Sequence, residues 1–115
     1  MLRSLLSFAA ALTLSAHAAG GDTLRLAFFA TELGRKGPGL LYRDIARGDD
    51  RQAEAVAAIV AHSAPDVIVL TGIDYDHDLL ALGALADRIA AAGGPVFTHL
   101  FALPPNAGIA SGVDL

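Results

Sequence analysis

The chain has 115 residues, of which 54% are hydrophobic, and a formal net charge of −4 with its histidines neutral. Its length allows one hydrophobic core and excludes a second domain of ordinary size. The acidic balance argues against a protein that holds nucleic acid non-specifically by neutralising phosphates, and the lack of cysteine excludes a disulfide-stabilised scaffold.

Residues 1–18 have the pattern of a secretory signal peptide. One cation, Arg3, precedes an apolar run at 5–14, and the small-residue sequence Ala16-His17-Ala18 offers a cleavage site. The apolar run is about ten residues long, whereas a membrane span needs roughly twenty. We therefore expect cleavage after Ala18, a secreted or periplasmic domain over 19–115, and no membrane span in the mature protein.

Strands and helices are predicted to alternate after the signal peptide. Alternating apolar residues predict a strand at 23–30, and the continuous apolar run at 67–70 predicts a strand at 66–70 that is covered on both faces. Between them, Asp49 and Asp50 are suitable N-caps for a helix that Pro65 ends. The order strand, helix, strand predicts a parallel βαβ unit and therefore an α/β fold.

A second helix and a third strand are predicted farther along the chain. Asp76 or Asp78 is placed to cap a helix whose apolar residues repeat at helical spacing over 79–90. Paired glycines at 93–94 end this helix. The apolar residues at 96–103 then predict a third strand.

The segment 34–49 is rich in glycine and basic residues and predicts a long irregular loop around a short turn of helix. Its glycine spacing fits neither the dinucleotide-binding fingerprint nor the P-loop. Arg35, Lys36 and Arg43 are candidate contacts for an anionic substrate, and the alternative is that they are solvated charges.

Three alternating aspartates, Asp74, Asp76 and Asp78, follow the second strand. Carboxylates at the carboxyl end of a strand are suitable ligands for a divalent cation. They do not begin an EF-hand loop, because Leu79 and Leu85 stand where its glycine and glutamate belong. Helix capping explains Asp76 and Asp78, which leaves Asp74 as the candidate metal ligand.

Several segments, taken in order, resemble the N-terminal part of secreted bacterial members of the endonuclease/exonuclease/phosphatase family. They are Leu26-Ala-Phe-Phe-Ala-Thr-Glu-Leu33, Gly37-Pro-Gly-Leu-Leu-Tyr-Arg-Asp44, Gly48-Asp-Asp-Arg-Gln52, Pro65-Asp-Val-Ile-Val-Leu-Thr-Gly-Ile-Asp-Tyr-Asp76 and Pro105-Asn-Ala-Gly-Ile-Ala-Ser-Gly-Val-Asp-Leu115. The resemblance implies the N-terminal portion of a four-layer α/β sandwich. It also implies Mg²⁺- or Mn²⁺-dependent hydrolysis of a phosphoester-containing substrate, with nucleic acid among the candidates.

Two positions depart from the family pattern. The family's first strand usually ends in Phe-Asn-x-Glu, and Ala30 replaces that asparagine. Its second motif is Leu-Gln-Glu, and Gly72 stands in place of the metal-binding glutamate. Glu32 and Asp74 are then the candidate metal ligands, and Asn106 joins the basic residues as a candidate substrate contact.

The family's later catalytic motifs have no counterpart up to Leu115. The chain is therefore expected to be a partial phosphoesterase domain over 19–115 that is inactive alone. The alternatives are a non-catalytic exported binding domain and a non-functional gene fragment. The sequence contains no signal for a particular oligomeric state.

Overall fold

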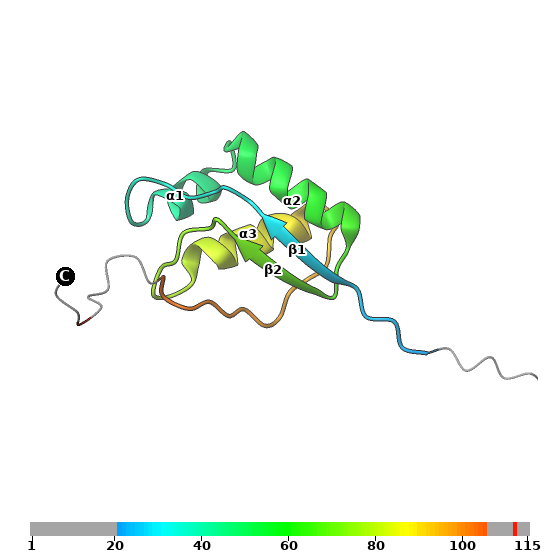
Figure 1. Cartoon of the computed structure of the whole chain (residues 1–115). Helices are drawn as coiled ribbons and strands as arrows, with labels where there is room; N and C mark the ends of the chain where they lie inside the picture. Colours follow the sequence, from blue (N-terminus) through cyan, green and yellow to red (C-terminus); the bar gives the residue numbers. More distant parts are fainter. Residues whose placement is uncertain (1–20, 106–111, 113–115) are drawn as a thin grey trace, which may run out of the picture.

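The structure is a computed structural model that describes residues 21–105 and Gly112, so the predicted signal peptide at 1–18 lies outside the described residues. The elements, in chain order, are β1 (Leu26–Ala30), α1 (Leu40–Arg47), α2 (Arg51–Ser63), β2 (Val67–Thr71) and α3 (Leu80–Ala91) (Figure 1). The predicted α/β class is confirmed. None of the helices in the described part of the chain has both the length and the apolar character that a membrane span requires.

β1 and β2 lie side by side and run parallel, with Leu26 opposite Val67 and Ala30 opposite Thr71. Both α1 and α2 lie between these strands in the sequence, so the predicted parallel βαβ connection is confirmed. The entry to the sheet is fixed by Asp66, whose Oδ2 accepts a 2.7 Å hydrogen bond from the Arg25 backbone N–H.

Two of the predicted helix caps are present. Asp50 is the N-cap of α2, and its Oδ1 accepts a 2.7 Å hydrogen bond from the Ala53 N–H. Asp76 lies before α3 and accepts hydrogen bonds from the backbone N–H groups of Leu80 and Ala81. These carboxylates pair with N–H groups that have no partner within a helix, so each stabilises the start of its helix.

All of the helices pack on one face of the sheet and form the core with it (Figure 1). The buried apolar residues are Leu33, Leu41, Ile45, Ala53, Val56, Ala57, Val60, Ala81, Leu85 and Ile89. The sheet contributes Phe29, Ile68 and Leu70, which are partly buried against this cluster. Segment 34–49 is more regular than predicted, because Leu41 and Ile45 bury one side of α1 against α3.

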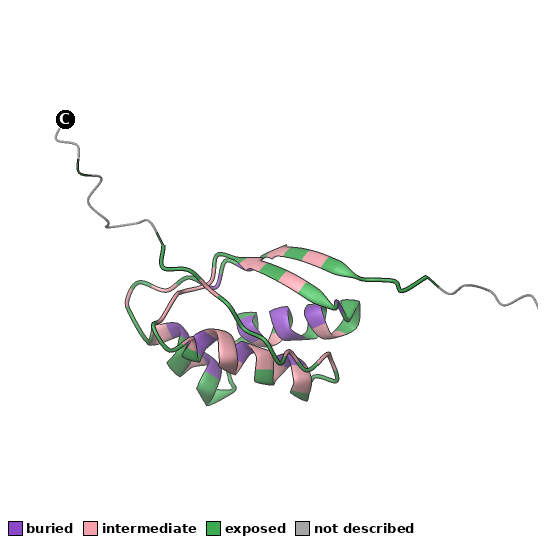
Figure 2. Cartoon of the chain, turned by 90° about the horizontal axis from the view of Figure 1, so that it is seen from below, coloured by how far each residue is buried: buried purple, intermediate pink, exposed green. Residues whose placement is uncertain are grey.

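No described element covers the opposite face of the sheet, so within the described residues the prediction that the second strand is covered on both faces was wrong. Val67 and Val69 of β2 are 47% and 53% exposed, and Phe28 of β1 is 71% exposed. Figure 2 shows the helices on one side of the strands and no described element on the other.

The third predicted strand is also absent from the structure: residues 94–105 contain neither helix nor strand. This segment runs beside β2 but makes no ladder with it, since the described sheet has only β1 and β2. Phe97 packs against the helical core instead. A cavity of about 670 Å³ separates β2 and α3 from the segment 96–103, so the outer edge of β2 stays unpaired within the described chain.

Candidate functional site

The carboxyl ends of β1 and β2 are joined by a buried threonine. The Thr31 backbone N–H donates to the Thr71 carbonyl at 2.9 Å. Its hydroxyl donates to the carbonyls of Thr71 and Gly72, at 2.9 and 3.1 Å. Thr31 is only 5% exposed, so these bonds replace those that water would make. The side chains that follow the two strands are thereby brought to the carboxyl end of the sheet, and 'this edge' below refers to that end.

Gly72 follows β2 in a left-handed conformation, with φ of 67°. A Cβ atom at this position would lie 2.8 Å from the Glu32 backbone nitrogen, which is closer than real side chains approach. The turn therefore has no room for a side chain where the family resemblance expects a metal-binding glutamate. The departure at Gly72 is part of the backbone path itself.

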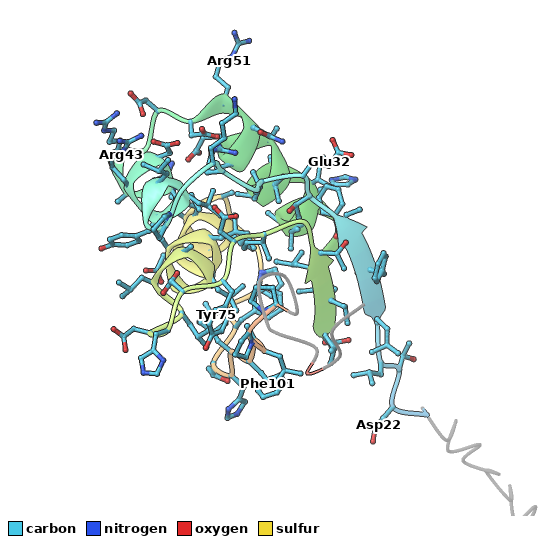
Figure 3. All side chains as sticks on the ribbon, turned by 60° about the vertical axis from the view of Figure 1, so that its left-hand side comes forward. Asp22, Glu32, Arg43, Arg51, Tyr75 and Phe101 are labelled. Atoms are coloured by element: carbon cyan, nitrogen blue, oxygen red, sulfur yellow. The ribbon has the colours of Figure 1, made fainter. Side chains whose placement is uncertain are left out.

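Glu32 lies in the turn that follows β1, with its side chain exposed to solvent (Figure 3). Its φ is 51°, a left-handed conformation that is unfavourable by about 1–2 kcal/mol for a residue other than glycine. Gln52 of α2 stabilises the turn, because its Nε2 donates to the Glu32 carbonyl at 2.9 Å and to the Thr31 carbonyl at 3.3 Å. No role was predicted for Gln52 from the sequence; its place in the first turn of α2 was the available signal.

Asp74 lies half-buried at the same edge, after β2. Its Oδ2 accepts a 3.0 Å hydrogen bond from the Arg35 backbone N–H. Its Oδ1 would lie 3.6 Å from a Cβ atom built on Gly34. Asp74 therefore ties the loop after β1 to the end of β2, and a cation bound here would share this carboxylate with the loop.

The Arg35 side chain is turned toward the protein rather than to solvent. Its Nε donates to Asp44 Oδ2 at 3.2 Å, its Nη2 to Asp50 Oδ2 at 2.9 Å, and its Nη1 to the Leu33 carbonyl at 3.0 Å. Burial on its own would lower the pKa of Arg35, but the hydrogen bonds to the two aspartates outweigh it and raise that pKa. The guanidinium therefore links the loop, α1 and the cap of α2.

The other predicted substrate contacts are dispersed. Lys36 is exposed on the loop, and Arg43 is exposed on α1. Arg43 Nη2 pairs with Asp44 Oδ1 at 3.0 Å. Hydrogen bonds from Arg43, and then from Arg35, hold the pKa of the Asp44 carboxyl below its ordinary value. Asn106 lies outside the described residues.

Metal binding at this edge would depend on few ligands. Across residues 21–105 and Gly112, no group of three or more histidine, aspartate or glutamate side chains is arranged to hold a metal ion. Asp76 is engaged by α3, and Asp50 by both α2 and Arg35. Glu32 and Asp74 are the carboxylates left at the strand ends. Two carboxylates suit Mg²⁺ only where water and substrate phosphate complete its octahedral shell.

The carboxyl end of the sheet is thus a hydrogen-bonded polar turn, with a solvent-facing carboxylate after one strand and a half-buried carboxylate after the other. Such an edge is where ligands bind in open α/β sheets. The residues that the structure describes here offer carboxylate oxygens and backbone hydrogen-bonding groups to a ligand. In comparisons with known proteins, the chain matches no protein-family model, no curated protein and no solved structure.

Proposed function

We propose that this chain is part of a metal-dependent phosphoesterase domain of the four-layer α/β sandwich type. One observation carries the proposal. The parallel pairing of β1 and β2, together with the Thr31 hydrogen bonds, brings Glu32 and Asp74 to the same edge of the sheet. In α/β sheets this edge is the usual location of a ligand site.

A bound Mg²⁺ or Mn²⁺ would stabilise negative charge on the phosphoryl oxygens of a phosphoester. Asp74 would supply a carboxylate fixed in place by the Arg35 N–H, and Glu32 an exposed one. Lys36 and Arg43, both exposed, lie on the neighbouring loop and helix, where an anionic substrate could reach them. The substrate class is phosphoesters, with nucleic acid among the candidates.

The chain alone is expected to lack hydrolytic activity. Ala30 and Gly72 have no side-chain ligands to offer, and the remaining carboxylates near the edge are engaged in caps and ion pairs. We expect it to bind the cation weakly and to contribute one part of a larger site.

The test is calorimetric titration of the whole chain with Mg²⁺ and with Mn²⁺. Asp74→Asn keeps an oxygen that can accept the Arg35 hydrogen bond and removes the negative charge. We expect this change to weaken cation binding by about tenfold or more. Asp78→Asn is the matched control, because it removes the same charge from an exposed neighbouring aspartate. Equal losses in the two variants, or no binding by the unaltered chain, would contradict the proposal.

A non-catalytic exported binding domain is the second candidate. It is favoured by the internal pairing of the polar groups: Arg35 satisfies Asp44 and Asp50, and Asp74 is held by the Arg35 backbone. A chain that unfolds cooperatively and binds neither cation would favour this candidate. A chain without a cooperative unfolding transition would instead indicate a non-functional fragment.

A further inference from the structure

The side chain of Gln52, in the first turn of α2, reaches the backbone turn that follows β1. Its Nε2 donates to the Glu32 carbonyl at 2.9 Å and to the Thr31 carbonyl at 3.3 Å. Within the described residues, no other donor is hydrogen-bonded to either carbonyl. One side-chain amide group therefore holds two consecutive carbonyls of this turn.

These two carbonyls are the ones that flank the Cα atom of Glu32. The Thr31 carbonyl carbon begins the φ torsion of Glu32, and the Glu32 carbonyl carbon ends it, so an amide bonded to both oxygens restrains this torsion. The restraint matters because Glu32 has a φ of 51°, in the left-handed region that favours glycine. On the other side of the turn, Gly72 lies so close that a Cβ atom there would be 2.8 Å from the Glu32 nitrogen. The Glu32 backbone is thus held between α2 and the end of β2.

The same end of α2 also holds the second carboxylate of the pair. Asp74 Oδ2 accepts a 3.0 Å hydrogen bond from the Arg35 backbone N–H. The Arg35 side chain in turn donates from Nη2 to Asp50 Oδ2 at 2.9 Å, and Asp50 is the N-cap of α2, two residues before Gln52. Glu32 is therefore connected to the start of α2 directly, and Asp74 through Arg35.

We propose that Gln52 is a positioning residue that sets the cation affinity of the Glu32–Asp74 pair. This inference rests on the proposed function, in which these two carboxylates bind Mg²⁺ or Mn²⁺. Without the Gln52 amide, the Glu32 backbone relaxes toward negative φ, and its carboxylate turns away from Asp74. Partners that orient metal ligands by hydrogen bonds typically change metal affinity by about 10–100-fold when they are removed.

NMR spectroscopy of the cation-free chain tests the hold of Gln52 on Glu32. At positive φ, the amide and Cα protons of one residue lie close together, so Glu32 should give a strong NOE between them. Gln52→Met removes both donors at similar side-chain length, and we expect it to weaken this NOE. Gln52→Lys can donate to the same carbonyls and should retain it. An unchanged NOE in Gln52→Met would overturn the proposal.

Calorimetric titration with Mn²⁺ tests the consequence for the site. We expect Gln52→Met to weaken binding by about tenfold. Ala58→Met is the matched control, because it adds the same side chain at an exposed position of the same helix and should leave binding unchanged. A weakened NOE with unaltered affinity would also overturn the proposal, since the direction of Glu32 would then not affect the site.

The two measurements separate the role of Gln52 from the proposed function itself. Cation binding that is weakened by Asp74→Asn but not by Gln52→Met would contradict the role of Gln52 alone. A chain that binds neither cation would contradict the proposed function and, with it, the effect of Gln52 on affinity. The NOE comparison needs no cation, so it decides in either case whether Gln52 fixes the conformation of Glu32.

Discussion

The two faces of the β1–β2 sheet have side chains of the same kinds but different surroundings. Phe29 and Leu70 are partly buried against the helical core, whereas their neighbours Phe28 and Val69 are 71% and 53% exposed. Consecutive residues of a strand point to opposite faces, so each pair differs only in what covers it. The apolar character of a parallel strand therefore predicts that both of its faces must be buried. It does not identify the element that buries each face.

The largest expected effect is a difference in the free energy of unfolding between two leucine variants. Leu85 is fully buried at the centre of α3, and Leu85→Ala should lower the free energy of unfolding by about 2–5 kcal/mol, because it removes contacts and leaves a cavity. Leu26 is 68% exposed on the face of the sheet turned away from the helices, and Leu26→Ala should change stability by about 0.5 kcal/mol or less.

Urea unfolding measures both changes. Similar losses in the two variants would mean that the face of the sheet carrying Leu26 is covered in solution.

The next largest effect is expected from larger side chains, which should destabilise the packed helices but be tolerated at the exposed end of β1. A Cβ atom on Gly94 would lie 2.7 Å from Ala61 Cα and 2.8 Å from Ile89 Cγ2, so Gly94→Ala should destabilise the protein by about 1–3 kcal/mol. Ala30 is exposed at the end of β1, and Ala30→Val should be tolerated within about 0.5 kcal/mol. Thermal unfolding provides the comparison. A neutral Gly94→Ala would show that the helices can separate there without loss.

The smallest expected effect is on how the stability of the protein depends on pH. Glu54 of α2 accepts hydrogen bonds from Arg88 of α3 at 2.6 and 2.7 Å, which hold the pKa of the Glu54 carboxyl below its ordinary value. A lowered folded-state pKa adds stability that is present above the unfolded pKa of about 4.3 and is lost as the pH falls through the folded value.

Glu54→Gln should therefore reduce the loss of thermal stability below about pH 4.3. The loss that comes from other acids, such as Asp44, should remain. Leu26 has the apolar neighbours Phe28 and Val67 on its face of the sheet, so Leu26→Ala should leave the pH dependence unaltered. Melting curves recorded across this acid range compare the three proteins. An acid profile for Glu54→Gln identical to that of the unaltered chain would show that the pair with Arg88 adds no stability.

Much of the candidate site was predictable residue by residue, but not as an arrangement. Glu32 and Asp74 could be placed at strand ends because strand boundaries follow local apolar patterns. The ion pairs of Arg35 with Asp44 and Asp50 could not be predicted from the sequence, because they depend on how α1 packs against the start of α2. The steric exclusion of a side chain at Gly72 depends on the Glu32 backbone, which is distant in sequence.

The sequence by itself determined the α/β alternation, the parallel pairing of the strands, and the presence of an aspartate cap before each of two helices, while the structure selected Asp50 and Asp76 among the candidates. Each of these follows from residues within a few positions of one another and from the geometry of a helical crossover. Only the tertiary structure decided that no described element covers one face of the sheet and that residues 94–105 do not join it. The physical reason is that local patterns specify which surfaces must be buried, whereas the partner that buries them is chosen by long-range packing.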